Sequence, residues 1–408
     1  MLDETRAIQN AINAFGPSGG EITLPSDATI SSEDLSITSN IVLSGVNPTI
    51  TLYLQSKCLN VEKNAFNVTI KNLTIDASYL GNRSALNVFA GAQNVSIQNV
   101  IIQNDISEKD AVISSGNYVK IQNLTFSNVT NSHPIQINGS HSIVENCRSI
   151  DQSTFHLVRV MGGITDIHID GNLAENRPLF DGGITLSPSS DIWIQNNNLI
   201  NFPNRTYGIY VNGGTLEPFK APFDNVFVTG NYVTAAAGAY NAIAIYGLSS
   251  NVLVANNTVD QTLSGHNAIA AASGVNVTIT QNTVFGCIEG EEGGIEVESN
   301  PMHNRFTGIS ENVNVTNNIV FNSQWGIYVR IMVPDHVNWD GSPLKSKNVL
   351  IEGNTVSSCT IGINLLYGDG IIVRDNLLID NTISLAVDKS NVLNYNIYSN
   401  VINGDYLP

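Results

Sequence analysis

A short pattern that recurs along the chain constrains the fold more than any other feature. Its copies include NVTIKNLTI at Asn67, NVSIQNVII at Asn94, NVLVANNTV at Asn251, NVTITQNTV at Asn276 and NVNVTNNIV at Asn312. Less regular copies fill the intervals, so successive starts lie roughly 21 to 27 residues apart, a period typical of solenoids. In each copy apolar residues alternate, an Asn or Gly interrupts them, and a second apolar segment follows. The pattern predicts two short strands that meet at a bend.

A third alternating segment precedes most copies, as in YGIYVNG at Tyr207, NAIAIYG at Asn241, GGIEVES at Gly293 and WGIYVRI at Trp325. Three strands in roughly 25 residues form one coil of a parallel β-helix, and a dozen or so stacked coils bury one continuous interior. The fold class predicted is therefore all-β, a parallel β-helix solenoid. The bend residues Asn72, Asn257, Asn282, Asn318 and Asn354 fit it, because Asn tolerates the left-handed conformation and can stack on its counterpart in the next coil.

The first residues predict a cap for the open end of the solenoid. Residues 3–15, DETRAIQNAINAF, place Ile8, Ile12 and Phe15 at helical spacing, and GPSGG then turns the chain into the strand EITLP. We expect residues 1–20 to form this cap and residues 21–408 to form one β-helix domain.

DETRAIQNAI, followed by GGEITLP and by Asn-Val-rich coils, resembles the right-handed parallel β-helix proteins of the pectate-lyase superfamily. The resemblance implies a right-handed, single-stranded β-helix. It also implies work on polysaccharides outside the cell, in a fold shared with viral tailspikes and with surface proteins of no known catalysis.

The charge of the chain limits its partners. The formal net charge is −17, and only 13% of the residues are charged. This balance argues against nucleic acid and anionic membranes, and against a polyanionic polymer unless a cation or a basic patch intervenes. No segment approaches the ~18 apolar residues of a membrane span, so we expect no membrane insertion. The C-terminal segment NYNIYSNVINGDYLP predicts no helical cap, which leaves room for an oligomer or a following domain.

Three connections are longer than the others, at residues 212–224, 298–311 and 330–347. Each falls between a third strand and the next Asn-Val strand, so all three leave the same edge of the solenoid. Insertions confined to one face usually build the binding side. Elongation by drift is the alternative interpretation.

The strand before these loops carries titratable and aromatic residues. If the first Ile or Val of each third strand points inward, the outward row is Gln136, Arg159, Thr185, Tyr210, Ala244, Ala270, Glu296 and Tyr328. Just before these strands lie His133, His156, Asp181, Tyr207, Tyr240 with Asn241, His266 with Asn267, Glu292, and Trp325. Sugars stack on aromatic faces and need a few placed polar groups, so this strip predicts a glycan-binding surface.

Two groups within the strip could carry chemistry. The first comprises His156, Arg159, Asp181, Tyr207 and Tyr210. In it, Asp181 could orient His156 as a base, and Arg159 could neutralise a uronate. The second comprises His266, Glu292, Glu296, Tyr328 and Arg330, with Asp335 and His336 on the long loop. For each group a satisfied structural network is the alternative, and Glu298 with Arg330 predicts a plain salt bridge.

We assign His266, Glu292, Glu296, His156, Arg159 and Asp181 as candidate catalytic residues. Candidate substrate-binding residues are Tyr207, Tyr210, Tyr240, Trp325, Tyr328, Arg330, Asp335 and His336. The small outward residues Ala244 and Ala270 predict the floor of a trough with room for a sugar ring. Replacing His266, Glu292 or Glu296 with Ala should reduce glycan turnover or binding and hardly change the melting temperature, because we expect outward side chains to contribute little to the core.

Departures from the family limit what the resemblance implies. The N-T-D, D-D, G-H-G and R-I-K pattern of polygalacturonases is absent, and so is the D-P-H motif of mannuronan epimerases. Glu292 and Glu296 would be about 13 Å apart on an extended strand, and Asp181 and Glu292 roughly 19 Å apart by coil rise. A glycosidase carboxylate pair needs ~5 to 10 Å, so neither pair suffices unless a loop residue such as Asp335 contributes.

The sequence therefore favours a secreted or cell-surface carbohydrate-active protein, a polysaccharide lyase or glycoside hydrolase. The alternative is a noncatalytic surface or tailspike-like protein that only binds glycans. We expect no required cofactor; the Glu-rich run from Glu289 to Glu298 could bind Ca²⁺, although a solvated acidic face is the preferred interpretation. Cys58, Cys147, Cys287 and Cys359 lack metal-ligand spacing and predict free, mostly buried thiols.

Overall fold

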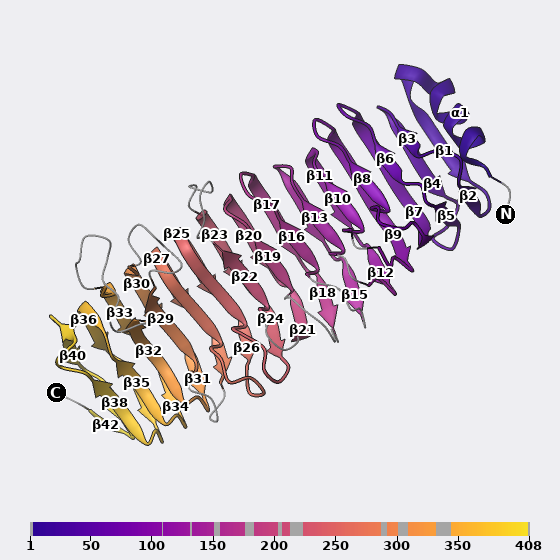
Figure 1. Ribbon diagram of the computed structural model, residues 1–408. Helices are drawn as coiled ribbons and strands as arrows, with labels where there is room; N and C mark the ends of the chain where they lie inside the picture. The colour runs from indigo at the N-terminus through magenta and orange to yellow at the C-terminus, as the bar shows by residue number, and fades with distance from the viewer. Residues whose placement is uncertain are drawn as a thin grey trace. The chain divides into compact units, whose positions relative to one another are not determined.

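The structure is a computed structural model that describes residues 3–107, 109–130, 133–150, 156–175, 183–202, 206–212, 223–286, 292–300, 309–331 and 344–406. The chain divides into two compact units, Met1–Ile184 (unit 1) and Thr185–Pro408 (unit 2). Each unit consists of stacked coils of parallel strands, as Figure 1 shows. The coils form a right-handed parallel β-helix of about 13 turns in total, which confirms the predicted fold class.

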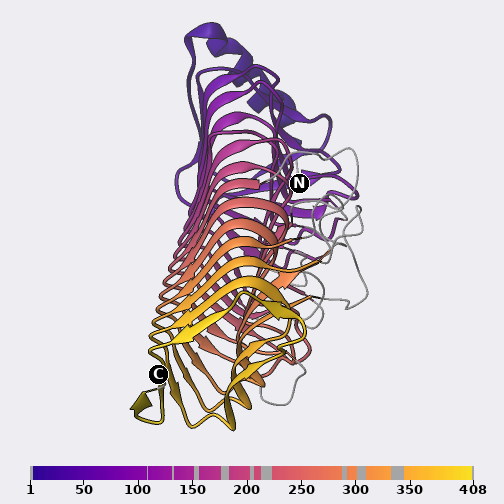
Figure 2. The same cartoon turned by 90° about the vertical axis from the view of Figure 1, so that its left-hand side faces the viewer.

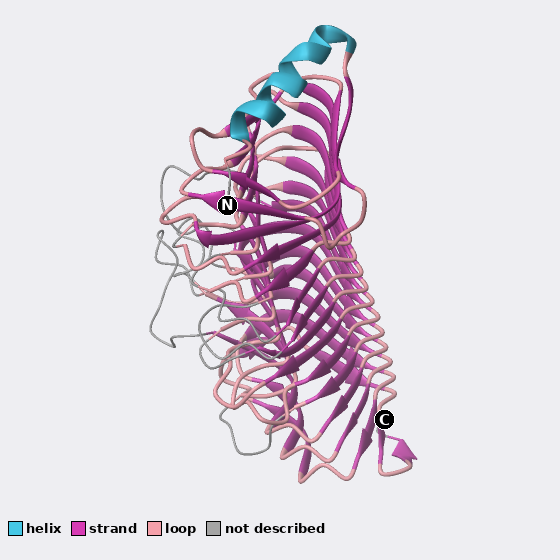
Figure 3. Ribbon diagram, turned by 90° about the vertical axis from the view of Figure 1, so that its right-hand side faces the viewer, coloured by secondary structure: helices cyan, strands magenta, loops and turns pink. Residues whose placement is uncertain are grey.

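Unit 1 begins with the predicted cap. Helix α1 (Thr5–Phe15) buries Ile8 and Ile12, and a 3-10 turn, η1 (Gly16–Ser18), leads into the first strand. The apolar residues of α1 recur on one face of the helix, and this face packs against β1 (Gly20–Leu24) and β3 (Leu35–Ile37). Glu4 accepts a hydrogen bond from the backbone of Thr29, which fixes the start of the helix to the first coil. Figure 3 shows the helix in cyan beside these coils.

Each coil of unit 1 contributes one strand to each of three parallel sheets. The first sheet contains β1, β4 (Ile41–Gly45), β7 (Phe66–Tyr79), β9 (Gln93–Gln103), β11 (Asn117–Gln122), β14 (Ser142–Glu145) and β17 (Thr165–Asp170). The second contains β2 (Ala28–Ile30), β5 (Thr51–Gln55), the ends of β7 and β9, β12 (Thr125–Ser127), β15 (Arg148–Ile150) and β18 (Leu173–Glu175). The third contains β3, β6 (Leu59–Val61), β8 (Leu86–Val88), β10 (Val112–Ser114), β13 (Ile135–Ile137) and β16 (Val158–Val160). Strand β19 (Ile184–Leu186) lies at the division between the units.

Unit 2 repeats this arrangement, and Figure 2 shows its stacked strands in orange and yellow. Its first sheet contains β20 (Ser190–Gln195), β23 (Phe223–Thr229), the ends of β25 (Ile243–Ala255) and β27 (Ile269–Thr280), β30 (Glu311–Thr316), β33 (Lys347–Glu352), β36 (Gly368–Arg374), β39 (Val392–Leu393) and β40 (Asn396–Tyr398). The second contains β21 (Asn198–Phe202), β24 (Tyr232–Ala235), β26 (Thr258–Asp260), β28 (Thr283–Phe285), β31 (Ile319–Phe321), β34 (Thr355–Ser357), β37 (Leu377–Ile379) and β41 (Val401–Ile402). The third contains β22 (Ile209–Asn212), the starts of β25 and β27, β29 (Ile295–Ser299), β32 (Trp325–Ile331), β35 (Ile361–Leu365) and β38 (Ile383–Val387). The short β42 (Asp405–Tyr406) pairs antiparallel with β41.

The interior of each unit is a stack of branched aliphatic side chains. In unit 2, Ile269, Ile295 and Ile327 occupy matching positions on successive strands and are fully buried. The same holds in unit 1 for Ile135 and Val158. Side chains alternate across a strand, so the residue after each of these lies on the outer face of the sheet, as predicted.

A ladder of buried asparagines runs through the bends of unit 2. Its members are Asn197, Asn231, Asn257, Asn282, Asn318, Asn354, Asn376 and Asn400. In each link the backbone N–H of one Asn donates to the Oδ1 of the next, at 2.9 to 3.1 Å. The side-chain Nδ2 donates to the same Oδ1 at 2.9 or 3.0 Å.

This ladder confirms that the bend asparagines stack, but the predicted backbone conformation is displaced by one position. The left-handed residue is the one before the ladder Asn, for example Asn256 before Asn257 and Gln281 before Asn282. At these bends an exposed residue adopts the left-handed conformation that turns the chain. The next residue, the ladder Asn, accepts the hydrogen bond of a buried backbone N–H. Asn72 differs, because it has a φ of 54° itself and lies outside this ladder.

Other predictions concern residues that the structure describes only in part. Cys58, Cys147 and Cys359 are free and buried, as predicted, whereas Cys287 lies outside the described residues. The three long loops also lie outside them, except for their ends. None of the described helices is long and apolar enough to cross a membrane.

Candidate functional site

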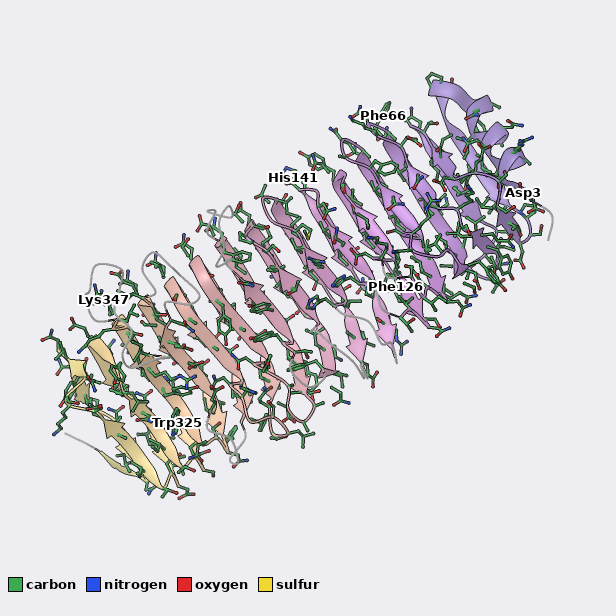
Figure 4. All side chains as sticks on the ribbon, in the orientation of Figure 1. Asp3, Phe66, Phe126, His141, Trp325 and Lys347 are labelled. Carbon is green, nitrogen blue, oxygen red and sulfur yellow. The ribbon has the colours of Figure 1, made fainter. Side chains whose placement is uncertain are left out.

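The candidate site lies on the outer face of the third sheet in unit 2. Strand register places Ala270, Glu296 and Tyr328 side by side, with Glu298 beside Arg330 two residues further on. With His266, Asn267 and Glu292, which precede the strands, they form a hydrogen-bonded group that we call the carboxylate cluster: His266, Asn267, Glu292, Glu296, Glu298, Tyr328 and Arg330. Figure 4 labels Trp325, at the start of the strand that carries Tyr328 and Arg330.

Most of the cluster is buried, which contradicts the expectation of exposed outward side chains. Glu296 is 1% exposed and Tyr328 is 0% exposed. Both oxygens of Glu296 accept hydrogen bonds, Oε1 from Arg330 Nε and Oε2 from Asn267 Nδ2 at 2.7 Å. The Tyr328 hydroxyl donates to Asn267 Oδ1. The premise of an exposed side chain is therefore wrong for Glu296, and we now expect its replacement with Ala to lower stability.

The accessible part of the cluster is a histidine–carboxylate pair. His266 Nδ1 lies 3.1 Å from Glu292 Oε2, and their side chains are 39% and 23% exposed. Arg330 Nη2 donates to Glu292 Oε1 at 2.9 Å, and Asn267 Nδ2 lies 3.2 Å from Glu292 Oε2. With Nδ1 held by the carboxylate, His266 presents Nε2 as the ring nitrogen for proton transfer.

The two carboxylates of Glu292 and Glu296 are much closer than the extended strand suggested. One amide nitrogen, Asn267 Nδ2, contacts an oxygen of each, so these two oxygens lie within about 6 Å of each other. Arg330 also bridges the two, through Nη2 to Glu292 and through Nε to Glu296. The prediction that this pair is too far apart for a glycosidase is therefore wrong. The predicted separation was the distance between backbone positions, whereas the carboxylate oxygens lie closer together than the backbone does.

The charges of the cluster follow from burial and from Arg330. Burial alone would raise the pKa of Glu292, but the hydrogen bond to His266 and the charge of Arg330 outweigh it and hold this pKa below its ordinary value. Burial alone would lower the pKa of Arg330, yet the carboxylates, Glu296 foremost, hold it above its ordinary value. Burial raises the pKa of Glu298 well above its ordinary value. The group thus contains one fixed cation shared among three acidic side chains.

An aromatic group adjoins the cluster and changes the predicted trough. Ala244 and Ala270 are fully buried beneath Tyr246, and Tyr207 and Tyr210 pack against them. Tyrosine rings thus fill the space that was predicted to receive a sugar ring. Tyr207 stacks on Tyr210 with ring centroids 4.3 Å apart and lies 5.3 Å from Tyr240.

This aromatic group reaches the accessible pair. Tyr240 makes an edge contact with His266, with centroids 5.1 Å apart, and on the other side of the cluster Trp325 makes an edge contact with Tyr328 at 4.9 Å. Tyr207, Tyr240 and Trp325 remain partly exposed. A sugar could therefore bind on partly exposed rings beside His266 rather than on an alanine floor.

The first predicted group is divided between the two units. His156 and Arg159 belong to unit 1, Tyr207 and Tyr210 belong to unit 2, and Asp181 lies outside the described residues. His156 stacks on His133, with ring centroids 5.3 Å apart, and Arg159 pairs in register with Gln136. His133 Nδ1 lies 2.5 Å from Asp110 Oδ1, so unit 1 also contains a histidine–carboxylate pair.

Comparisons with known proteins agree with this architecture. A protein-family model described as a right handed beta helix region matches residues 155–330. The tailspike protein of Escherichia coli bacteriophage HK620, solved in complex with a pentasaccharide, is 15% identical, with 97% of this chain and 77% of that one covered and a TM-score of 0.60. The Dettilon tailspike protein is also 15% identical, with 82% and 66% covered and a TM-score of 0.54. The chain is a right-handed parallel β-helix protein. No curated protein matches it.

One member of the carboxylate cluster, Asn267, was not predicted as a candidate site residue from the sequence. Asn267 joins Glu292, Glu296 and Tyr328, but the strip analysis gave it no role. The available signal was the amide at the same coil position in the preceding coil, Asn241, which donates to the hydroxyl of Tyr246. Asp335 and His336 of the candidate site lie outside the described residues.

Among the residues that the structure describes, no group of three or more His, Cys, Asp or Glu side chains could hold a metal ion. Residues 287–291 of the Glu-rich run lie outside that set.

Proposed function

We propose that this protein is a secreted or cell-surface glycoside hydrolase that acts on an uncharged glycan, with His266 and Glu292 as its catalytic residues. The observation that carries the proposal is the accessible His266–Glu292 pair, whose carboxylate is held by Arg330 and Asn267 and lies within about 6 Å of a second carboxylate. Glu292 would stabilise positive charge that develops on the sugar ring or activate a water, while His266 transfers the proton.

The charge of the cluster supports a hydrolase over a lyase. A lyase that acts on uronates must neutralise a substrate carboxylate, and Arg330 is the cluster's only fixed cation. Its guanidinium already contacts Glu292, Glu296 and Glu298, the last at 3.9 Å. A second anionic group would meet uncompensated negative charge in a poorly solvated site. An uncharged sugar would avoid that cost.

The aromatic group supports a glycan as the substrate. Tyr207, Tyr240 and Trp325 provide partly exposed rings on the two sides of the accessible pair. A tailspike of similar fold was solved in complex with a pentasaccharide, so an oligosaccharide ligand is compatible with this architecture. The proposed location outside the cell rests on the resemblance to β-helix proteins that work on extracellular polysaccharides.

Noncatalytic glycan binding is a second candidate, favoured by the burial of Glu296 and Tyr328. In that case the cluster would be a structural network, and the rings alone would bind the sugar. The first candidate predicts new chain ends from the substrate, whereas the second predicts binding without products.

The test incubates the protein with a panel of neutral polysaccharides and polyuronates and follows new reducing ends and unsaturated ends. We expect reducing ends from a neutral glycan and a loss of at least about 100-fold in turnover for His266→Ala and for Glu292→Gln. His168→Ala is the matched control, because His168 is a similarly exposed histidine paired with a carboxylate, Asp166, in unit 1. Binding without products would favour the second candidate. Normal turnover in these variants, with loss in His156→Ala and Arg159→Ala, would move the site to unit 1.

A further inference from the structure

The carboxylate cluster contains more acidic groups than its cation can balance. Arg330 contacts Glu292, Glu296 and Glu298, and the last two are 1% and 4% exposed. If all three carboxyl groups were ionised, two negative charges would lack a counter-charge in a largely buried site. Buried charges without partners are strongly unfavourable, so at least one of these groups should hold a proton.

Hydrogen-bond geometry indicates which groups are ionised. Glu296 accepts from Arg330 Nε at one oxygen and from Asn267 Nδ2 at the other. Glu292 accepts from Arg330 Nη2 at one oxygen and lies within reach of Asn267 Nδ2 at the other. A carboxylate accepts at both oxygens, whereas a protonated carboxyl also needs an acceptor for its O–H, and the partners named here are donors. Glu292 and Glu296 are therefore carboxylates.

Glu298 has the opposite surroundings. Its Oε2 lies 3.9 Å from Arg330 Nη2, too far for a hydrogen bond, and its Oε1 is buried with no hydrogen-bond partner. On one side its register partner is Ala272, which provides no donor side chain. Among the described residues no nitrogen donor thus hydrogen-bonds to Glu298, although Arg330 lies 3.9 Å away, and the ionised Glu296 lies two residues away on the same face of β29.

We propose that Glu298 is protonated in the folded protein and shares its proton with Glu296, as a positioning residue that keeps Glu296, Arg330 and Glu292 in their observed arrangement. Its role as a positioning residue rests on the proposed hydrolase function, whereas its protonation does not. A protonated carboxyl can donate to a carboxylate, and such a bond is short and strong. The cluster then carries one net negative charge before His266 is counted.

The electrostatics of the surroundings agree with this assignment. Burial, followed by the charge of Glu296, raises the pKa of Glu298 well above its ordinary value, and only Arg330 opposes them strongly. Burial also raises the pKa of Glu296 above its ordinary value, although the charge of Arg330 and a hydrogen bond with Glu298 oppose it. The titratable and charged groups that act on Glu298 from the strands around it are Glu292, Glu296, Tyr246, Tyr328 and Arg330.

The test compares two single variants whose substituted residues lie two positions apart on β29. Glu298→Gln replaces a neutral acid by a neutral amide that does not titrate, so we expect its melting temperature to be no lower than that of the wild type near neutral pH. Glu296→Gln replaces a carboxylate, and its amide group must face either Arg330 Nε or Asn267 Nδ2, donor against donor. We expect it to melt at least about 5 °C lower.

The pH dependence gives a second readout. Because the folded pKa of Glu298 is raised, its stabilising effect is complete below its unfolded value and is lost as pH rises through the folded value. The wild type should therefore lose more melting temperature than Glu298→Gln between about pH 5 and about pH 9. If Glu298→Gln melts as low as Glu296→Gln, or if its pH dependence equals that of the wild type, the protonation is wrong.

Activity separates the positioning role from the proposed function. The alkaline limit of turnover should lie at higher pH in Glu298→Gln than in the wild type. An equal limit in both proteins would overturn the positioning role. A wild-type protein that cleaves no glycan would contradict the proposed function alone, since the melting comparisons do not depend on turnover.

Discussion

At the scale of single residues, Tyr328 shows how the cluster depends on buried polar contacts. Its hydroxyl donates to Asn267 Oδ1, which also accepts from the backbone of Gly293 at 2.9 Å. Tyr328→Phe removes one of these bonds without leaving a cavity, so we expect a loss of about 1 kcal/mol in the free energy of unfolding, measured in urea. Tyr210→Phe is the control and should change it by less than about 0.5 kcal/mol. Equal losses would show that the hydrogen bond of Tyr328 contributes nothing measurable to the free energy of unfolding.

A second residue, Asp105 of unit 1, should make stability depend on pH. Its carboxyl is fully buried, with Oδ1 accepting from the backbone of Ser107 at 2.9 Å and Oδ2 without a partner. Burial raises the pKa of Asp105 to about 6. A raised folded pKa means that stability falls as pH rises through that value. Asp105→Asn should remove this fall in urea unfolding, and parallel pH curves for the two proteins would contradict the assignment.

The sequence located most of the candidate site but not its burial. His266, Glu292, Glu296, Tyr328 and Arg330 were predicted together because alternation along a strand decides which face a side chain occupies. Alternation does not decide what covers that face. The buried state of Glu296, and its contact with Glu292 through Asn267, depend on side-chain directions that a period of two residues does not contain.

At the scale of elements, the asparagine ladder of unit 2 should contribute more stability than the similar row of exposed asparagines. Asn282→Ala removes the acceptor for the backbone and the side chain of Asn257, and leaves both donors buried. We expect a loss of about 3 kcal/mol or more. Asn276 also links to the neighbouring coil, through an exposed bond of 3.2 Å to Asn251. Asn276→Gly keeps its left-handed backbone and should cost less than about 1 kcal/mol; a similar loss in both variants would contradict the distinction.

The elements themselves were predicted well because the repeat specifies them many times. The cap helix, the strand order and the bends all follow from periodicity, turn residues and the need to cover an open end. The displaced left-handed position was missed because two residues at each bend are often both Asn, as in Asn256 and Asn257. Composition does not distinguish the residue that turns the chain from the residue that bonds to it.

At the scale of the whole molecule, the negative charge should select among polysaccharides. The net charge of −17 repels polyanions at long range, and salt screens this repulsion. We therefore expect an uncharged glycan to bind with nearly the same affinity at low salt and at about 0.5 M salt, where the Debye length is only a few ångströms. A polyuronate should bind weakly at low salt. Calorimetric titration checks both, and tighter binding of the polyuronate at low salt would contradict the preference.

The asparagine ladder also gives the stack of unit 2 a direction and a natural unit of growth. Each ladder Asn offers its oxygen to the preceding coil, and its own donors depend on the oxygen of the following one. A gene duplication that inserted one whole coil would supply both partners, whereas an insertion of half a coil would leave buried donors unmatched. The number of coils in this protein can therefore change during evolution by whole coils, because the hydrogen bonds at each junction are the same as those already present in the ladder.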